Sequence, residues 1–313
     1  MQVLTDQKTW DLPKPGLIEI ENTVNFSNLT EFIRPYFDLL KPRVSSLVVV
    51  TTATGFYLAS DSPLDSWALI YTVLATALLA GGAVCLNQVL ERHADAQMDR
   101  TSGRPLPTAQ LRVITATLYG VLLLLSGTLI LSFKIDILPA MLGLASSLIY
   151  LFAYTPLKGK TPFCTTVGAF PGAIPPLIGW TAAKGQLTIE AWTLFGILFL
   201  WQYPHFLAIA WIYRDDYRRG GFKMLPLMDT SGRRTAVQIV IFTFLLGCLS
   251  IFPWGLEHAG NIYLGSAVVL SLAFLTTSLI LLRTPTQVCA GYVIRASIVY
   301  LPLLLLMLAL DRL

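Results

Sequence analysis

Nine long apolar stretches constrain this sequence more than any other feature. A helix needs about 20 predominantly apolar residues to cross a bilayer. We therefore predict an all-α polytopic membrane protein with nine transmembrane helices, at residues 42–60, 66–90, 111–133, 136–154, 163–183, 191–212, 235–256, 262–282 and 292–310. The first is the weakest because its TTATG segment is polar, although Gly and Thr are common where transmembrane helices pack closely.

The charge content supports this class and excludes others. Only 13% of the 313 residues are charged, whereas an ordinary soluble domain is about 25% charged. This scarcity excludes a soluble enzyme, a disordered chain and a disulfide-stapled secreted domain. The net charge of +4 is small, which argues against nucleic acid as a partner. The four cysteines show no CxxC or Cys/His spacing, so they indicate neither a zinc site nor a disulfide framework.

Lys and Arg are distributed unevenly between the two ends of the predicted helices. Nineteen of the 22 fall in the N-terminal tail and in the loops on its side, and only Lys134, Lys184 and Arg312 fall on the other. Because loops rich in Lys and Arg stay in the cytoplasm, we expect a cytoplasmic N-terminus and an outer C-terminus.

The first 40 residues are polar and differ from the membrane region that follows. They lack the apolar segment of a signal peptide, and they contain too many acids for a transit peptide. We expect residues 1–40 to form a partly disordered cytoplasmic tail, with an interfacial amphipathic helix at 30–41, and residues 41–313 to form a single transmembrane domain. These features favour a bacterial inner (plasma) membrane over an organelle.

Oxygen-bearing side chains recur every four residues at the end of the second predicted helix. Asn87, Glu91 and Asp95 share one helix face because four residues turn about 400°, and Asp99 continues the row if the helix extends that far. Such a row is repulsive unless a cation neutralises it, and oxygen ligands suit Mg²⁺, which often also binds substrate phosphates. The alternative is a solvated helix end whose acids pair with the nearby arginines Arg92, Arg100 and Arg104.

A second acidic and basic segment follows the sixth predicted helix. Asp215 and Asp216 are adjacent, so their side chains point about 100° apart on a helix and do not aim at one ion. Arg214, Arg218 and Arg219 surround them, and Lys158 and Lys160 lie in another loop on the same side. Acids for Mg²⁺ beside bases for phosphate oxygens indicate a site, open to the cytoplasmic side, for an apolar substrate that bears a diphosphate.

The motifs resemble those of a known family. Asn87-x3-Glu91-x3-Asp95, followed by R-T-x-x-R-P-L, resembles the first motif of the UbiA superfamily of intramembrane prenyltransferases. Further segments resemble its haem O synthase (protohaem IX farnesyltransferase) branch: K-P-R-V at 41–44, Y-T-P-L-K at 154–158, P-P-L-I-G-W at 175–180, W-Q-Y-P-H-F at 201–206 and R-D-D-Y-R-R-G-G at 214–221. The second D-x-x-x-D motif of the wider superfamily is missing, and Asp216 is the acid that matches the branch.

The resemblance implies nine transmembrane helices around a central cavity, and transfer of a farnesyl group from farnesyl diphosphate to a vinyl side chain of haem B, with haem O and diphosphate as products. It implies Asn87, Glu91, Asp95 and Asp216 as catalytic residues and Mg²⁺ ligands, and Arg43, Arg104, Lys158 and Arg214 as diphosphate-binding residues. A haem A synthase is the implied downstream partner, in the route to cytochrome oxidase.

Three alternatives remain open from the sequence. His205 is the candidate ligand for the haem iron, but it could equally be a hydrogen-bonded packing histidine. The acceptor could be another aromatic compound, such as a hydroxybenzoate, homogentisate or chlorophyllide. A secondary transporter is less favoured because transporters place charges near the bilayer midplane, whereas the acids here gather at helix ends.

Overall fold

The described part of the chain consists of helices and the loops that connect them. The computed structural model describes residues 26–60 and 63–312, and these contain no strand. The chain divides into two compact units between Arg34 and Pro35. Of the first unit only residues 26–34 are described, and they begin α1 (Phe26–Leu39), which overlaps the helix predicted at 30–41. The expected disorder of the tail at residues 1–25 lies outside the described residues.

The second unit contains all the other helices. They are α2 (Pro42–Ala59), α3 (Ser66–Asp95), α4 (Val113–Lys134), α5 (Ile137–Leu148), the π-helix η1 (Ile149–Tyr154), α6 (Thr155–Leu157), α7 (Cys164–Ala173), α8 (Pro175–Lys184), α9 (Ile189–Ile212), α10 (Arg214–Arg219), α11 (Leu225–Met228), α12 (Arg233–Ser250), α13 (Phe252–Gly255), α14 (Asn261–Arg283) and α15 (Gln287–Leu310).

All nine predicted spans are helical, but the count of nine membrane crossings is not confirmed. Within the described residues, seven helical segments are long and apolar enough to cross a membrane. Helix α2 falls short in hydropathy because its 18 residues include Pro42 and Arg43 as well as several Ser and Thr. The span predicted at 163–183 is divided into α7 and α8, because Pro175 and Pro176 lack the N–H groups that would continue the hydrogen bonding of α7.

An apolar surface on α4 fits a membrane location. Leu118, Leu122 and Leu125 are 64%, 62% and 56% exposed, and they follow one another at the three- and four-residue spacing of one helix face. A continuous exposed face of this kind is not tolerated in water. The chain is therefore a multi-pass membrane protein.

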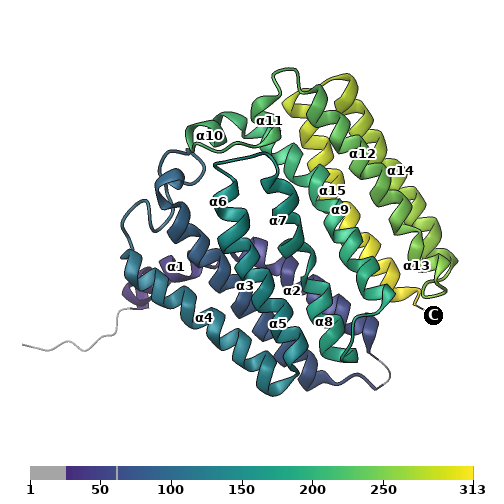
Figure 1. The fold of residues 1–313 in the computed structure, drawn as a ribbon, viewed down its shortest axis with the longest axis horizontal. Helices are drawn as coiled ribbons and strands as arrows, with labels where there is room; N and C mark the ends of the chain where they lie inside the picture. The colour runs from purple at the N-terminus through teal and green to yellow at the C-terminus, as the bar shows by residue number, and fades with distance from the viewer. Residues whose placement is uncertain (1–25, 61–62, 313) are drawn as a thin grey trace, which may run out of the picture. The chain divides into compact units, whose positions relative to one another are not determined.

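The helices of the second unit pack along one another, and their two ends differ (Figure 1). Helix α3 packs on α4, α2 on α8, and α12 on both α9 and α14. The α2–α8 contact is especially close, since a Cβ at Gly55 or Gly179 would overlap the backbone of Pro176 or Thr52. Helices α10 and α11 lie at one end of the bundle, and α13 and the C-terminus lie at the other. Helix α9 connects the two ends.

Candidate active site

The predicted row of oxygen ligands lies on the last turns of α3. This helix extends to Asp95, so Asn87, Glu91 and Asp95 do share one face. Asn87 and Asp95 are each only 1% exposed. Asp99 does not continue the row, because α3 has ended and the chain turns at residues 96–104.

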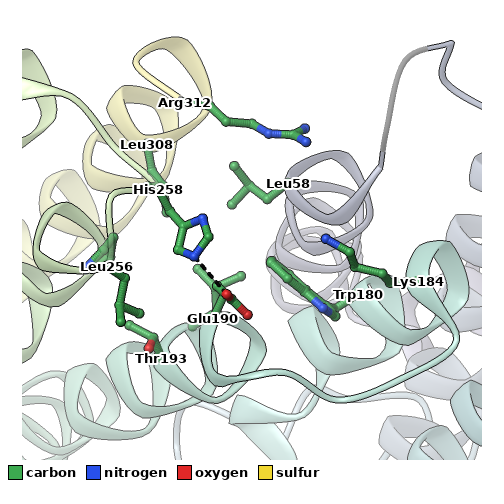
Figure 2. A pocket seen from close by; sticks show the side chains of 11 residues that line it. Leu58, Trp180, Lys184, Glu190, Thr193, Leu256, His258, Leu308 and Arg312 are labelled. Atoms are coloured by element: carbon green, nitrogen blue, oxygen red, sulfur yellow. Dashed lines mark ion pairs between the residues drawn. The ribbon is translucent and has the colours of Figure 1, made fainter.

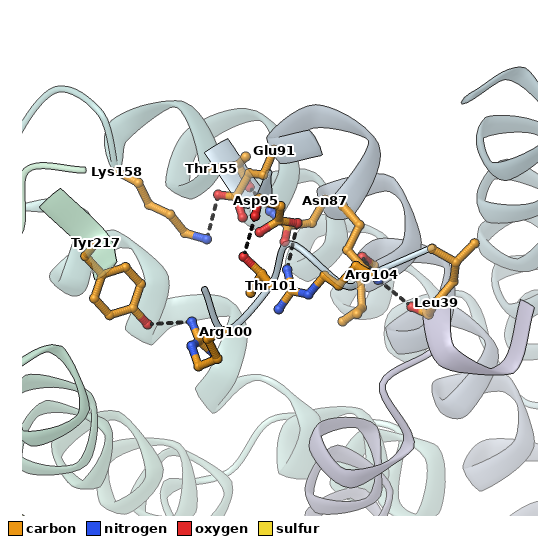
Figure 3. Close-up of polar contacts among 12 residues, drawn as sticks. Leu39, Asn87, Glu91, Asp95, Arg100, Thr101, Arg104, Thr155, Lys158 and Tyr217 are labelled. Atoms are coloured by element: carbon orange, nitrogen blue, oxygen red, sulfur yellow. Dashed lines mark hydrogen bonds and ion pairs between the residues drawn. The ribbon is translucent and has the colours of Figure 1, made fainter. Parts of the chain in front are cut away.

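Two carboxylates of this row are paired with basic side chains (Figure 3). Glu91 forms an ion pair with Lys158 at 2.7 Å, and Asp95 forms one with Arg104 at 2.7 Å. Burial alone would lower the pKa of Lys158, but the Glu91 carboxylate outweighs it and raises that pKa. The side chains of Glu91 and Lys158 are each 10% exposed, so both charges are largely removed from water. Asp95 thus does pair with Arg104, as the alternative to a metal site predicts, but Asp95 itself is buried in the bundle and is not part of a solvated helix end.

The hydrogen bonding leaves oxygen atoms of the row available as ligands. Asn87 donates through Nδ2 to Oγ1 of Thr155 at 2.9 Å, so its Oδ1 is left as an acceptor. Oδ1 of Asp95 is buried and accepts no hydrogen bond. Desolvating a carboxylate oxygen without a partner is unfavourable, and a cation at this point would satisfy it. The donor set thus fits Mg²⁺, although no three Asp, Glu, His or Cys side chains of the described residues gather into a metal-binding group.

Asp216 has a different position from the other predicted ligands. It lies on α10 and accepts hydrogen bonds from the backbone N–H groups of Asp99 at 2.8 Å and Arg100 at 3.3 Å. Arg219 pairs with both Asp216 and Asp99. Burial would raise the pKa of Asp216, but the two backbone donors and Arg219 lower it below its ordinary value. Asp216 therefore fixes the α3–α4 loop onto α10.

The same loop is held by an aromatic contact. The Arg100 guanidinium lies over the rings of Tyr213 and Tyr217, 5.3 and 5.5 Å from their centroids, and donates to the Tyr217 hydroxyl at 3.3 Å (Figure 3). Asp215, in contrast, is exposed and pairs with Arg218. The prediction that the two adjacent aspartates point in different directions is thus confirmed.

Lys41 is a further candidate for the site, which the sequence analysis did not single out. Burial, together with the charges of Arg104 and Lys158, lowers the pKa of Lys41 to about 7, against the opposing effect of Asp95 and Glu91. Its ammonium therefore belongs to this group of charges. Lys41 lies in the K-P-R-V segment, the same motif that led to the prediction of Arg43.

Three predicted residues lie away from these pairs. Arg43 is exposed on the first turn of α2. Arg214 lies over the ring of Trp211, 4.7 Å from its centroid. His205 lies on α9, stacks on Trp201 at 4.7 Å, and its Nδ1 is 2.7 Å from Oγ of Ser297 on α15.

The fold and these residues define an intramembrane prenyltransferase. The sequence matches the UbiA prenyltransferase family over residues 48–298, and the chain therefore belongs to that family. Curated relatives of this chain are more specific. A protoheme IX farnesyltransferase of Koribacter versatilis is 41% identical over 311 residues, 96% of both chains. One of Salinibacter ruber is 44% identical over 276 residues, 88% of this chain and 98% of the relative. The resemblance found in the motifs is thus confirmed.

Solved structures share the fold at low sequence identity. A structure of digeranylgeranylglyceryl phosphate synthase has a TM-score of 0.76 at 17% identity, and the match covers 90% of this chain and 98% of the other. A UbiA homologue from Archaeoglobus fulgidus, bound to DMAPP and Mg²⁺, has a TM-score of 0.62 at 16% identity, and the match covers 85% and 99%. These likenesses confirm the UbiA fold.

Proposed function

We propose that this chain transfers the farnesyl group of farnesyl diphosphate to a vinyl side chain of haem B, which gives haem O and diphosphate. The observation that carries the proposal is the pair of buried contacts Glu91–Lys158 and Asp95–Arg104 at the end of α3. They bring together two bases for diphosphate and two acids for a cation. The identity to protoheme IX farnesyltransferases, 41–44% in the relatives above, supports farnesyl as the donor group and haem as the acceptor.

The site residues have separate roles in this proposal. When bound by Asn87, Glu91 and Asp95, Mg²⁺ would supply charge that grips the diphosphate and stabilises it as a leaving group. Lys158 and Arg104 exchange their carboxylate partners for diphosphate oxygens and neutralise the charge that develops as the allylic C–O bond breaks. The terminal carbon of the vinyl group then bonds to the farnesyl carbon, which leaves a carbocation on the other vinyl carbon. Water adds there and loses a proton to diphosphate or solvent, which completes the hydroxyethylfarnesyl group. Arg43 and Arg214 remain predicted diphosphate contacts.

The Ser297 contact favours His205 as the ligand of the haem iron. The Ser297 hydroxyl donates to the carbonyl of Ile294 at 2.7 Å, so its single proton is already used. Nδ1 of His205 must then be the donor toward Ser297, and Nε2 keeps its lone pair. A histidine that ligates a metal typically donates its other ring N–H in this way.

We expect His205→Ala to weaken haem B binding by at least about 10–100-fold, since the loss of the orienting partner of a metal ligand alone costs up to this much. Ser297→Ala, which removes only the orienting contact, gives a smaller loss. Haem titration of the purified protein measures both variants. Unchanged haem affinity and turnover in His205→Ala would leave His205 as a packing histidine.

Lys41 should make the binding of farnesyl diphosphate depend on pH. Its pKa of about 7 in the folded protein means that the ammonium is charged below this pH and neutral above it. We expect KM for farnesyl diphosphate to rise as the pH passes from 6 to 8, and Lys41→Met to remove most of this rise while keeping the raised KM. Steady-state kinetics at fixed Mg²⁺ over this pH range measures the effect. An identical pH profile in Lys41→Met would exclude Lys41 from diphosphate binding.

The location of the site follows from the charge distribution. We infer that the N-terminus and the candidate active site face the cytoplasm, the C-terminus faces outside, and the membrane is the bacterial inner membrane, because most Lys and Arg fall on the side of α10 and the α3–α4 loop. A haem A synthase as partner rests on the family resemblance alone.

The direct test is incubation of membranes containing this chain with farnesyl diphosphate, Mg²⁺ and haem B. Mass spectrometry should detect haem O, with none in membranes lacking the chain. Parallel incubations offer a hydroxybenzoate or homogentisate as acceptor. If a prenylated benzoate formed and no haem O did, the acceptor would be an aromatic acid and not haem B, and the protein would still be a prenyltransferase.

A further inference from the structure

A cavity lies at the end of the bundle remote from the candidate active site. Glu190 in the first turn of α9 lines it, whereas α10 and Asp216 follow the last turn of the same helix. The cavity has a volume of about 190 Å³, well above the ~10–15 Å³ that one water requires. Its lining combines apolar and charged side chains, among them Leu58, Trp180, Lys184, Glu190, His258 and Arg312 (Figure 2).

The charged side chains of this cavity are held in different ways. Glu190 pairs through Oε1 with Nε2 of His258 at 2.7 Å. Arg312 donates to the carbonyls of Tyr57 and Ser60 at 2.8 and 2.7 Å, which anchors it at the end of α2 and leaves three of its five N–H donors. Figure 2 shows Glu190 between His258 on one side and the pair of Trp180 and Lys184 on the other.

Several polar atoms here have no matching partner. The indole Nε1 of Trp180 is buried, in a residue only 4% exposed, and donates no hydrogen bond. Oε2 of Glu190 is buried and has no partner at ordinary hydrogen-bond geometry, although the Thr188 side chain and the backbone N–H of Glu190 lie beside the carboxylate. Lys184 lies over the Trp180 ring, 5.7 Å from its centroid, and forms no ion pair with any described residue. A buried donor without an acceptor is unfavourable, so this arrangement points to a ligand.

The free groups define the chemistry of that ligand. Lys184, Trp180 and Arg312 offer N–H donors, which suit phosphate oxygens. Glu190 offers one acceptor, which suits a cationic N–H donor. Leu58, Leu194 and Leu308 are among the apolar lining residues, and the lining comes from the ends of membrane helices, where lipid headgroups lie. We propose that this cavity binds the headgroup of an aminophospholipid, with its phosphate at Lys184, Trp180 and Arg312 and its ammonium at Glu190.

The two charges distinguish this headgroup from others of similar size. A choline headgroup carries a positive charge but no N–H to donate to Oε2 of Glu190. A glycerol headgroup keeps the phosphate but brings no cation, so its net negative charge would lie near the Glu190 carboxylate. The site is therefore selective for phosphatidylethanolamine over phosphatidylcholine and phosphatidylglycerol.

Native mass spectrometry of the purified full chain tests the proposal, with the three lipids added at equal acyl-chain composition. We expect phosphatidylethanolamine to bind at least about tenfold more tightly than the other two. Soluble glycerophosphoethanolamine, added in a parallel arm, should compete only weakly if the apolar wall contributes. Full saturation by this soluble headgroup would instead identify a site for a free metabolite and overturn the lipid assignment.

Variants locate the effect in the cavity. Lys184→Gln should weaken all three lipids, whereas Glu190→Gln should abolish the preference for ethanolamine. Lys134→Gln is the matched control, because Lys134 lies over the Tyr71 ring at 5.9 Å in a similar cation–π contact outside this cavity. Equal binding of the three lipids by the unmodified protein, undiminished lipid binding in Lys184→Gln, or an unchanged preference in Glu190→Gln would each overturn the proposal. Haem O formation is not used in this test, so its outcome is independent of the proposed function.

Discussion

Asp95→Asn should lower haem O formation by about 10²–10³-fold, the scale of removing one group that stabilises developing charge. The substitution keeps the shape of the side chain and still lets Arg104 donate to Oδ1, but it removes the carboxylate that a cation would need. We expect the variant to remain folded. Product formation by mass spectrometry at saturating farnesyl diphosphate, over a range of Mg²⁺ concentrations, measures the loss. If the variant kept most of its activity, Asp95 would not be a metal ligand.

Asp95→Ala is a less suitable variant because it also removes the partner of Arg104. Breaking a buried ion pair costs about 3–5 kcal/mol, and since the Arg104 side chain is 21% exposed, we expect a loss near or below the lower end of this range. Thermal unfolding in detergent separates this effect from catalysis. Asp215→Asn is the matched control, because Asp215 is exposed and pairs only with Arg218, so its activity should stay within about twofold.

The sequence was sufficient to predict the elements that depend on local periodicity. The nine apolar stretches are all helical, and the four-residue spacing placed Asn87, Glu91 and Asp95 on one face of α3. It was not sufficient to predict the number of crossings. Polar residues lower the hydropathy of α2, and the prolines at the start of α8 divide the predicted span 163–183 into two helices that are each too short to cross a membrane.

The partners of the charged groups could not be read from the sequence. Lys158 lies 67 positions after Glu91 and contacts it only because α3 packs beside η1 and α6. Lys41 precedes α2 in a left-handed backbone conformation, and Arg43 is exposed on the first turn of that helix. The K-P-R-V motif alone therefore does not say which of the two bases faces the site. Glu190 and His258 are similarly brought together by the packing of α13 on α9.

Replacement of Asp216 is the second substitution for which we expect a large loss of activity. We expect Asp216→Ala to lower activity by about 10–100-fold, because two backbone N–H groups lose their acceptor, Arg219 keeps only Asp99, and the α3–α4 loop, which carries Arg104, is held less firmly on α10. The lowered pKa of Asp216 means that this docking stabilises the fold at neutral pH and is lost only as the pH falls through that lowered value. Activity at neutral pH therefore reports the docked loop.

Hydrogen exchange distinguishes docking from metal binding at this residue. In Asp216→Ala the amides of Asp99 and Arg100 should exchange faster, since they have lost their acceptor, while the Mg²⁺ concentration that gives half-maximal rate changes little. Arg219→Gln should give a smaller change because it leaves both backbone hydrogen bonds in place. Arg218→Gln, whose partner Asp215 is exposed, should change neither measurement. Unchanged amide exchange together with a strongly raised Mg²⁺ requirement would instead identify Asp216 as the metal ligand that the family resemblance implies.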